Sequence, residues 1–253
     1  MPDCIENFVD SHSNSGDNVS NPPGDRISGL TPARKGGLSL LIALLPWTLP
    51  LERVIAYVDG YNLYYGLRSK GWKRFYWLNV AALARNLLKP NQTLVQTKYF
   101  TTIVKRPDDR RRRQAVFVEA LQTLPDFRIY YGQFLEDTVT CRQCGHNYTT
   151  YHEKMTDVNI SVEFMSDAYQ DRFDVAFLIS ADSDLVGPVD TIRHLFADKR
   201  TIVAFPPDRT SFALQKAANA ALHIGHNELS KSMFPPIVLK PNGVALHRPS
   251  EWH

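Results

Sequence analysis

The feature that most constrains the fold is an alternation of strand-like and helix-like segments between residues 54 and 221. The runs 54–58 and 174–180 are short and rich in Val, Ile and Phe, which is typical of buried strands. Segment 108–124 instead has apolar residues at i, i+3, i+4 and i+7, which predicts an amphipathic helix. The expected strands are 54–58, 94–104, 127–134, 174–180 and 201–205, and the expected helices are 79–88, 108–124, 156–170, 187–197 and 212–221.

This order of segments predicts an α/β fold with three layers, α/β/α, and a mostly parallel central sheet. In open sheets of this kind, ligands bind beyond the carboxyl ends of the strands. Asp59 follows the first expected strand, and Asp182 and Asp184 follow the fourth. We therefore expect these carboxylates to meet at one edge of the sheet.

Several carboxylates at one edge need a counter-charge. Two unit charges about 4 Å apart repel by roughly 4 kcal/mol at an effective dielectric constant of about 20. A divalent cation removes this repulsion, and carboxylate oxygens are the ligands that Mg²⁺ and Mn²⁺ prefer. Such an ion can activate water for the cleavage of a phosphodiester. The acids therefore predict a Mg²⁺ or Mn²⁺ site.

Three sequence blocks resemble the signature blocks of NYN domains, which are PIN-like ribonuclease domains. The blocks are VDGYNL at 58–63, EKMTDV at 153–158 and SADSDL at 180–185. Each block is weak evidence alone, but all three occur in the right order at expected strand or helix ends. The resemblance covers roughly residues 53–230, and it is closest to the LabA-like branch. It implies a PIN-like (Rossmannoid) fold and a metal-dependent ribonuclease that acts on RNA.

The resemblance also implies which acids bind the metal and take part in catalysis: Asp59, Asp157, Asp182 and Asp184. Another interpretation remains open for each residue taken singly. An Asp-Gly pair such as Asp59-Gly60 is common in turns. The other three lie near expected helix starts, where acids interact favourably with the helix dipole.

Three further polar residues have roles implied by the same resemblance. Asn62 would position a metal-bound water or a phosphate, and Ser180 would hold the loop geometry or touch that water. Lys154 would orient Asp157 or contact phosphate. Related sequences often carry another acid at the position of Glu163. Six helical residues turn it about 120° away from Asp157, so it could flank the site but not share its face.

The charge pattern suggests where the RNA backbone would bind. The net charge is only +3, so bulk charge barely favours a nucleic-acid partner. A basic run at 105–113 includes Arg110 and Arg111, which we expect to contact phosphates. A solvated charged face is the equal alternative. Arg209 and Ser211 follow the last main strand and could also touch phosphate, although a rigid turn is at least as compatible with them.

Aromatic residues gather just after Asp59. They are interleaved with basic residues, and RNA bases could stack on them beside the acids. Such rings are also common in protein cores, and we expect Tyr64 and Trp77 to be core residues. The cluster consists of Tyr61, Tyr64, Tyr65, Trp72, Phe75, Tyr76 and Trp77.

The expected organisation is a disordered or weakly structured extension at 1–50, a domain at 51–232 and a tail at 233–253 that packs on the domain. Cys141 and Cys144 lie in an expected insertion at 134–152 and suggest a zinc site as a minority interpretation. A metal-free turn is the alternative, and a second chain could complete the site, which keeps a homodimer open. Only three cysteines are present, which favours the cytoplasm. The apolar run 37–50 is short and contains two prolines, so no stable membrane insertion is expected.

The sequence thus predicts a Mg²⁺- or Mn²⁺-dependent endoribonuclease that acts on single-stranded RNA. The first alternative is a non-catalytic regulator that binds RNA or protein and retains the acidic pocket. The second is a phosphatase of the haloacid dehalogenase type, which needs an Asp two positions after Asp59. Tyr61 occupies that position and counts against it.

Overall fold

The computed structural model describes residues 51–104, 107–140 and 147–253, and for 134–140 and 147–154 it describes the backbone alone. Its centre is a six-stranded sheet with the order β3-β2-β1-β6-β7-β8. Every pair of neighbouring strands in this sheet is parallel. The strands are β1 Glu52–Asp59, β2 Gln92–Thr101, β3 Phe127–Tyr131, β6 Val175–Ile179, β7 Arg200–Phe205 and β8 Ala220–His223.

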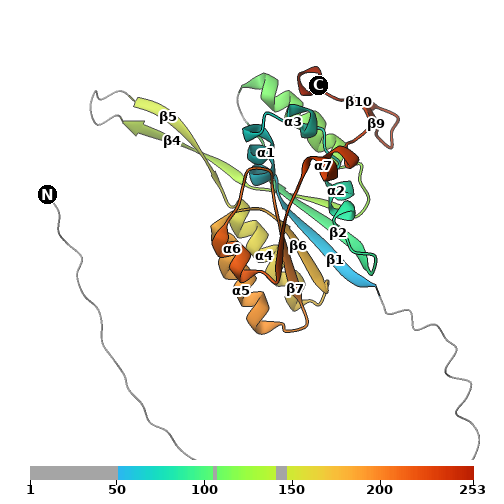
Figure 1. Cartoon of the computed structure of the whole chain (residues 1–253). Coiled ribbons are helices and arrows are strands. Elements are labelled where there is room, and N and C mark those ends of the chain that lie inside the picture. The colour runs from blue at the N-terminus through green and yellow to red at the C-terminus, as the bar shows by residue number, and fades with distance from the viewer. Residues whose placement is uncertain (1–50, 105–106, 141–146) are drawn as a thin grey trace, which may run out of the picture. The chain divides into compact units, whose positions relative to one another are not determined.

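Helices cover both faces of the sheet, as Figure 1 shows. One face carries α1 Gly60–Ser69, the 3-10 helix η1 Lys73–Tyr76, α2 Val80–Asn86, α3 Asp108–Leu121 and α7 His226–Lys231. The other face carries α4 Thr156–Tyr169, α5 Val186–Leu195 and α6 Phe212–Ala217. Successive side chains of β1 point to opposite faces of the sheet. Val54, Ala56 and Val58 pack against the first helix layer, whereas Ile55 and Tyr57 pack against the second. The predicted three-layer α/β/α fold is confirmed.

Helix α1 and strand β8 are among the elements that were not predicted from the sequence. Helix α1 contains two glycines and three tyrosines, which are poor helix formers, and it is held by Asp59 as its N-terminal cap. Strand β8 forms where the expected helix 212–221 should have continued, since α6 ends at Ala217.

The helix expected at 156–170 is present, but three of the four residues of the apolar stripe that predicted it are exposed, and only Met165 packs against the core. Val158, Val162 and Tyr169 are 56%, 59% and 83% exposed. Helix α4 has a second apolar stripe, and this one is buried because Phe164 packs against two other rings. Its ring centroid lies 4.9 Å from Tyr57 and 5.9 Å from Phe173.

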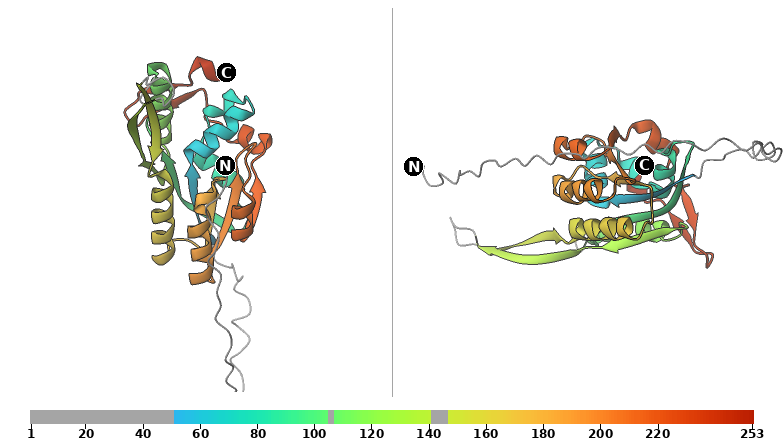
Figure 2. Two further views of the ribbon diagram at one scale, coloured as in Figure 1. Left: turned by 90° about the vertical axis from the view of Figure 1, so that its left-hand side faces the viewer. Right: turned by 90° about the horizontal axis from the view of Figure 1, so that it is seen from below.

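The expected insertion forms an antiparallel hairpin of β4 Gln133–Thr140 and β5 Asn147–Lys154. Figure 1 and the right-hand view of Figure 2 show this hairpin reaching beyond the helices. Cys141 and Cys144 lie outside the described residues, so the zinc hypothesis stays a prediction. The extension 1–50 also lies outside them.

The C-terminal residues pack on the first layer. Strands β9 Ile237–Leu239 and β10 Ala245–His247 pair with each other, and Val238 and Leu246 join the core. The indole Nε1 of Trp77 donates a hydrogen bond to the Pro235 carbonyl at 2.8 Å. A 3-10 helix, η3 Ser250–Trp252, follows and is capped by His253. No helix in the described ranges is long and apolar enough to cross a bilayer.

Candidate metal centre

The acids lie where the strand order of the sheet reverses. From β1 the chain adds β2 and β3 on one side, whereas β6, β7 and β8 extend the other side. A crevice opens beyond the carboxyl ends of the strands at such a point. Asp59 is the last residue of β1, and Ser180 follows the neighbouring strand β6 directly.

Three carboxylates meet at this end of the sheet. Asp59, Asp157 and Asp182 each offer one oxygen, and these oxygens all lie within 4.8 Å of one another. Asp157 joins this group from the first turn of α4. Carboxylate oxygens at this spacing suit a hard divalent cation. The structure does not bring Asp184, the fourth expected acid, into this group.

Asp59 is the most deeply buried of the three, with 3% of its surface exposed. The backbone N–H of Asn62 donates to its Oδ1 and the hydroxyl of Ser180 donates to its Oδ2, each at 2.9 Å. Burial raises the pKa of Asp59, and the nearby Asp182 carboxylate adds to the rise, although both hydrogen bonds oppose it. A bound cation would therefore offset the cost of a buried negative charge.

Asn62 and Ser180 hold the loop after β6 against α1. The Asn62 Oδ1 accepts a hydrogen bond from the Ala181 N–H at 3.2 Å, and the Ser180 Oγ accepts one from the Asp182 N–H at 3.1 Å. The Oδ1 of Asp182 accepts the N–H of Asp184 at 3.0 Å. Asp184 thus contacts Asp182 through its backbone, and its side chain is exposed.

Asp157 is placed by an unusual backbone turn. Met155, which precedes α4, adopts a left-handed conformation with φ of 78°. Residues with a side chain avoid this region at a cost of about 1–2 kcal/mol. The turn leads the chain from β5 into α4, so that Asp157 falls in the first helical turn. Of Lys154, the last residue of β5, only the backbone is described.

Gly60 is required by close packing next to Asp59. A Cβ atom on Gly60 would lie 2.6 Å from Cζ of Tyr99 and 2.7 Å from the carbonyl oxygen of Phe100. Both distances are far below van der Waals contact. Gly60 therefore allows α1 to start directly against β2, a role that the Asp-Gly pair alone did not reveal.

The expected phosphate-binding residues fall into two groups. Arg110 lines a pocket beside the acids, and the guanidinium carbon of Arg209 lies 5.7 Å from the ring centroid of Tyr65 on α1. Arg111 instead pairs with Asp108 at 3.3 Å and does not line the pocket. The hydroxyl of Ser211 accepts the Leu214 N–H and caps α6, so its main contact is structural.

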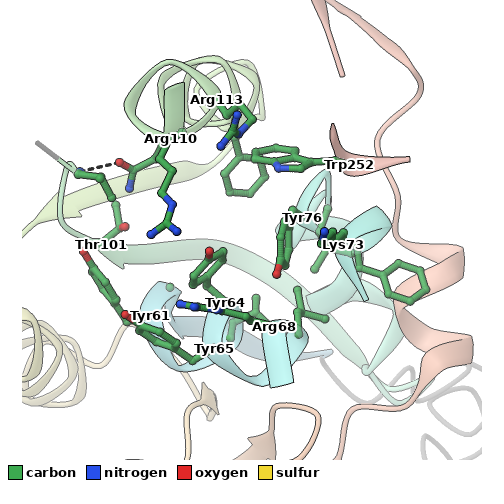
Figure 3. Close-up of a pocket in the computed structure, with 18 of the residues that line it drawn as sticks. Tyr61, Tyr64, Tyr65, Arg68, Lys73, Tyr76, Thr101, Arg110, Arg113 and Trp252 are labelled. Atoms are coloured by element: carbon green, nitrogen blue, oxygen red, sulfur yellow. Dashed lines mark hydrogen bonds between the residues drawn. The ribbon is translucent and has the colours of Figure 1, made fainter. Parts of the chain in front are cut away.

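The pocket has a volume of about 980 Å³. Gly60 and Tyr61, the two residues that follow Asp59, are among the residues that line it. Figure 3 shows α1 along one side, α3 along the opposite side, and Tyr76 with Trp252 between them. Trp77 is fully buried as expected, but Tyr64 lines the pocket and is only half-buried. The aromatic pattern pointed to this region, whereas the contribution of the C-terminal Glu251 and Trp252 is a product of tertiary packing.

The family model of the NYN domain matches residues 53–225. The chain belongs to the NYN domain family. The matched part of this NYN protein contains all three acids and α1. It ends before the C-terminal segment that supplies Trp252 to the pocket.

A curated relative of this NYN protein is 6-hydroxy-3-succinoylpyridine 3-monooxygenase HspA of Pseudomonas putida. The two are 25% identical over 245 residues, which cover 79% of this chain and 75% of the relative. A solved structure of a protein of unknown function from Vibrio parahaemolyticus matches with a TM-score of 0.48 and 19% identity. That match covers 74% of this chain and 98% of the other.

Proposed function

We propose that this NYN protein is a metal-dependent ribonuclease that hydrolyses phosphodiester bonds of RNA. The observation that carries the proposal is the meeting of three carboxylate oxygens within 4.8 Å, supplied by Asp59, Asp157 and Asp182. Bound Mg²⁺ or Mn²⁺ would supply an activated water and stabilise negative charge on the phosphate. Membership of the NYN domain family supports a nuclease activity, and the residues of the three sequence motifs suggest the LabA-like branch.

The chain's own residues have separate tasks in this proposal. Asp59, Asp157 and Asp182 hold the cation. Ser180 and Asn62 are positioning residues, because they fix Asp59 and the loop of Asp182 through hydrogen bonds. Lys154, which is close in sequence to Asp157, is proposed to contact phosphate.

The test is cleavage of labelled single-stranded RNA by the purified chain with Mn²⁺ or with EDTA. We expect cleavage with Mn²⁺ alone, and a loss of at least about a hundredfold in Asp182→Asn, because one ligand carboxylate is removed. Asp198→Asn is the matched control, since Asp198 is also an aspartate but is 77% exposed on its side chain and lies outside the group of three.

A chain that binds RNA without cutting it in Mn²⁺ or Mg²⁺ would support the regulator instead. Equal cleavage by Asp182→Asn and the wild type would overturn the metal site itself.

A second candidate is oxidation of a small heteroaromatic acid, which the name of the Pseudomonas relative suggests. The observation that favours it is the pocket, because aromatic walls and arginines would also admit a pyridine ring with a carboxylate. Oxygen uptake with a hydroxypyridine carboxylate and a reduced nicotinamide would support this candidate. No uptake under conditions where RNA is cut would exclude it.

A further inference from the structure

We infer that the pocket beside the acids binds one unpaired nucleotide of single-stranded RNA, with its base against the tyrosine rings and its phosphate at Arg68 and Arg110. This inference rests on the proposed function for the identity of the polymer. It adds a binding site that is separate from the three carboxylates.

The pocket has the size and position for such a role. Its volume of about 980 Å³ is at the upper end of the roughly 300–1,000 Å³ that ligand pockets span. Its wall includes Gly60 and Tyr61, the two residues that follow Asp59. A nucleotide bound there would therefore lie near, along the RNA chain, any phosphate held by the acids.

The walls of the pocket are aromatic. The ring centroids of Tyr64 and Tyr76 lie 5.0 Å apart, and Trp252 meets Tyr76 edge-on at 5.7 Å. Figure 3 shows Tyr64 and Tyr76 in the middle of the pocket, with Trp252 above Tyr76. Stacking on such rings is how proteins hold unpaired bases without strong sequence preference.

The charges in the pocket suit a phosphate. Arg113 is engaged by Asp109 at 2.6 Å and by Glu251 at 2.8 Å. By contrast, no ion pair between described residues involves Arg68 or Arg110, and both line the pocket. In Figure 3 the guanidinium of Arg110 extends from α3 into the space above Tyr64, while Arg68 approaches from α1. Two such cations beside aromatic rings suit a base and its phosphate, and the guanidinium carbon of Arg68 lies 5.9 Å from the ring centroid of Tyr65.

A base in a duplex cannot use this pocket, because it is paired and stacked between its neighbours. The nucleotide must therefore be unpaired before it enters, which favours single strands, loops and ends.

The test measures binding of a fluorescein-labelled RNA decamer to the full chain by anisotropy, with EDTA present so that no cleavage occurs. We expect Tyr64→Ala to weaken binding about tenfold, because one stacking ring is lost. Tyr64→Phe keeps the ring and should bind within about twofold of the wild type. Tyr169→Ala is the matched control, since Tyr169 is 83% exposed on α4, across the sheet from the pocket.

A second pair of variants tests the phosphate contact. Arg110→Ala should weaken binding several-fold, whereas Arg112→Ala should not, although both remove one positive charge from an exposed position of α3. The same decamer as a duplex, or with abasic sugars in place of nucleotides, should bind about tenfold more weakly than the single strand. Urea unfolding of each variant confirms that the fold is intact.

Equal binding by Tyr64→Ala, Arg110→Ala and their controls would overturn the inference, as would equal affinity for single strand and duplex. Loss of binding of nicotinate, a pyridine carboxylate, in Tyr64→Ala without any change in RNA binding would also overturn it. The outcome is independent of catalysis. If the chain does not cleave RNA but its RNA binding depends on Tyr64, only the nuclease proposal is contradicted. If the chain cleaves RNA and its binding does not depend on Tyr64, only this inference is contradicted.

Discussion

Ser180 and Asp59 are joined by a hydrogen bond of 2.9 Å between the serine hydroxyl and a carboxylate oxygen, at the ends of two neighbouring parallel strands. Ser180 is fully buried, and its Oγ also accepts the backbone N–H of Asp182. One hydroxyl thus sets the positions of two acids of the candidate metal centre.

We expect Ser180→Ala to lower the affinity for Mn²⁺ by about 10–100-fold, as removal of a residue that supports a metal ligand commonly does. Isothermal titration calorimetry measures this change. Ser211→Ala is the control, because that hydroxyl caps α6. Its loss should lower the free energy of unfolding by about 1 kcal/mol and leave Mn²⁺ affinity unchanged. Unchanged affinity in Ser180→Ala would contradict the positioning role.

Asp59→Asn should stabilise the metal-free protein at neutral pH and abolish Mn²⁺ binding. Burial raises the pKa of Asp59 above its ordinary value, so the folded state binds a proton more readily than the unfolded chain. The ionised carboxylate therefore costs stability above the folded-state pKa, and this cost fades as pH falls toward the pKa of an exposed aspartate.

The measurement is the melting temperature of Asp59→Asn and of the wild type in EDTA across pH 3.5–8. We expect the advantage of the variant to be largest at neutral pH and to shrink in acid. An advantage that grew as pH fell would show that the pKa of Asp59 is lowered instead.

Gly60→Ala should lower the free energy of unfolding by about 1–3 kcal/mol, the usual cost of overpacking, because the new methyl group would press on Tyr99 and on the Phe100 carbonyl. Gly187→Ala is the opposite case. Gly187 lies in the first turn of α5, and apart from its chain neighbours and its own helix its added methyl group would meet no atom within 4 Å, so alanine there should change the free energy of unfolding by less than about 1 kcal/mol. Urea unfolding distinguishes the two, and equal effects would show that α1 can shift to accommodate a side chain.

Lys98→Met should be strongly destabilising. The Lys98 side chain is fully buried, and its ammonium lies 2.6 Å from carboxylate oxygens of both Glu163 and Asp167. Asp167 also accepts the hydroxyl of Tyr57. Loss of the ammonium removes the ion-pair partner of Glu163 and leaves Asp167 paired with Arg172 alone, at 3.2 Å, so we expect a cost of about 3–5 kcal/mol.

Lys240→Met supplies the comparison for this change. Its pair with Glu119 is 30% and 42% exposed on the two side chains, so its loss should cost at most about 1 kcal/mol. Chemical denaturation measures both variants. Similar losses for the two lysines would mean that the buried network is hydrated.

The fold was predictable because the central strands are continuous apolar runs that alternate with helical patterns. Asp59 and Asp182 could be placed from strand ends alone, since parallel strands end at one edge. Asp157 could not, because it comes from the start of a helix, and only the resemblance to NYN domains pointed to it. The extent of the site was harder still: Asp184 shares a motif with Asp182, yet the 3-10 helix η2 Ser183–Leu185 turns its side chain out to solvent.

Other features depend on tertiary packing that no local pattern encodes. Lys98 falls inside a predicted strand, and nothing nearby in sequence indicates that α4 supplies Glu163 and Asp167 to it. Which of the two apolar stripes of α4 is buried likewise depends on contacts with Tyr57 and Phe173, which come from other parts of the chain.

Helix α1 carries Asp59 at its cap and Tyr64 and Arg68 along its length. Tyr64 stands five residues beyond Asp59, or about 7.5 Å along the axis at 1.5 Å per residue. A helix is a stiff spacer, so the distance between the acids and the rings cannot drift as it would on a loop. Any RNA strand whose base is bound by those rings would be cut at a constant number of nucleotides from that base. One cleavage product would therefore end at a fixed distance from the bound base.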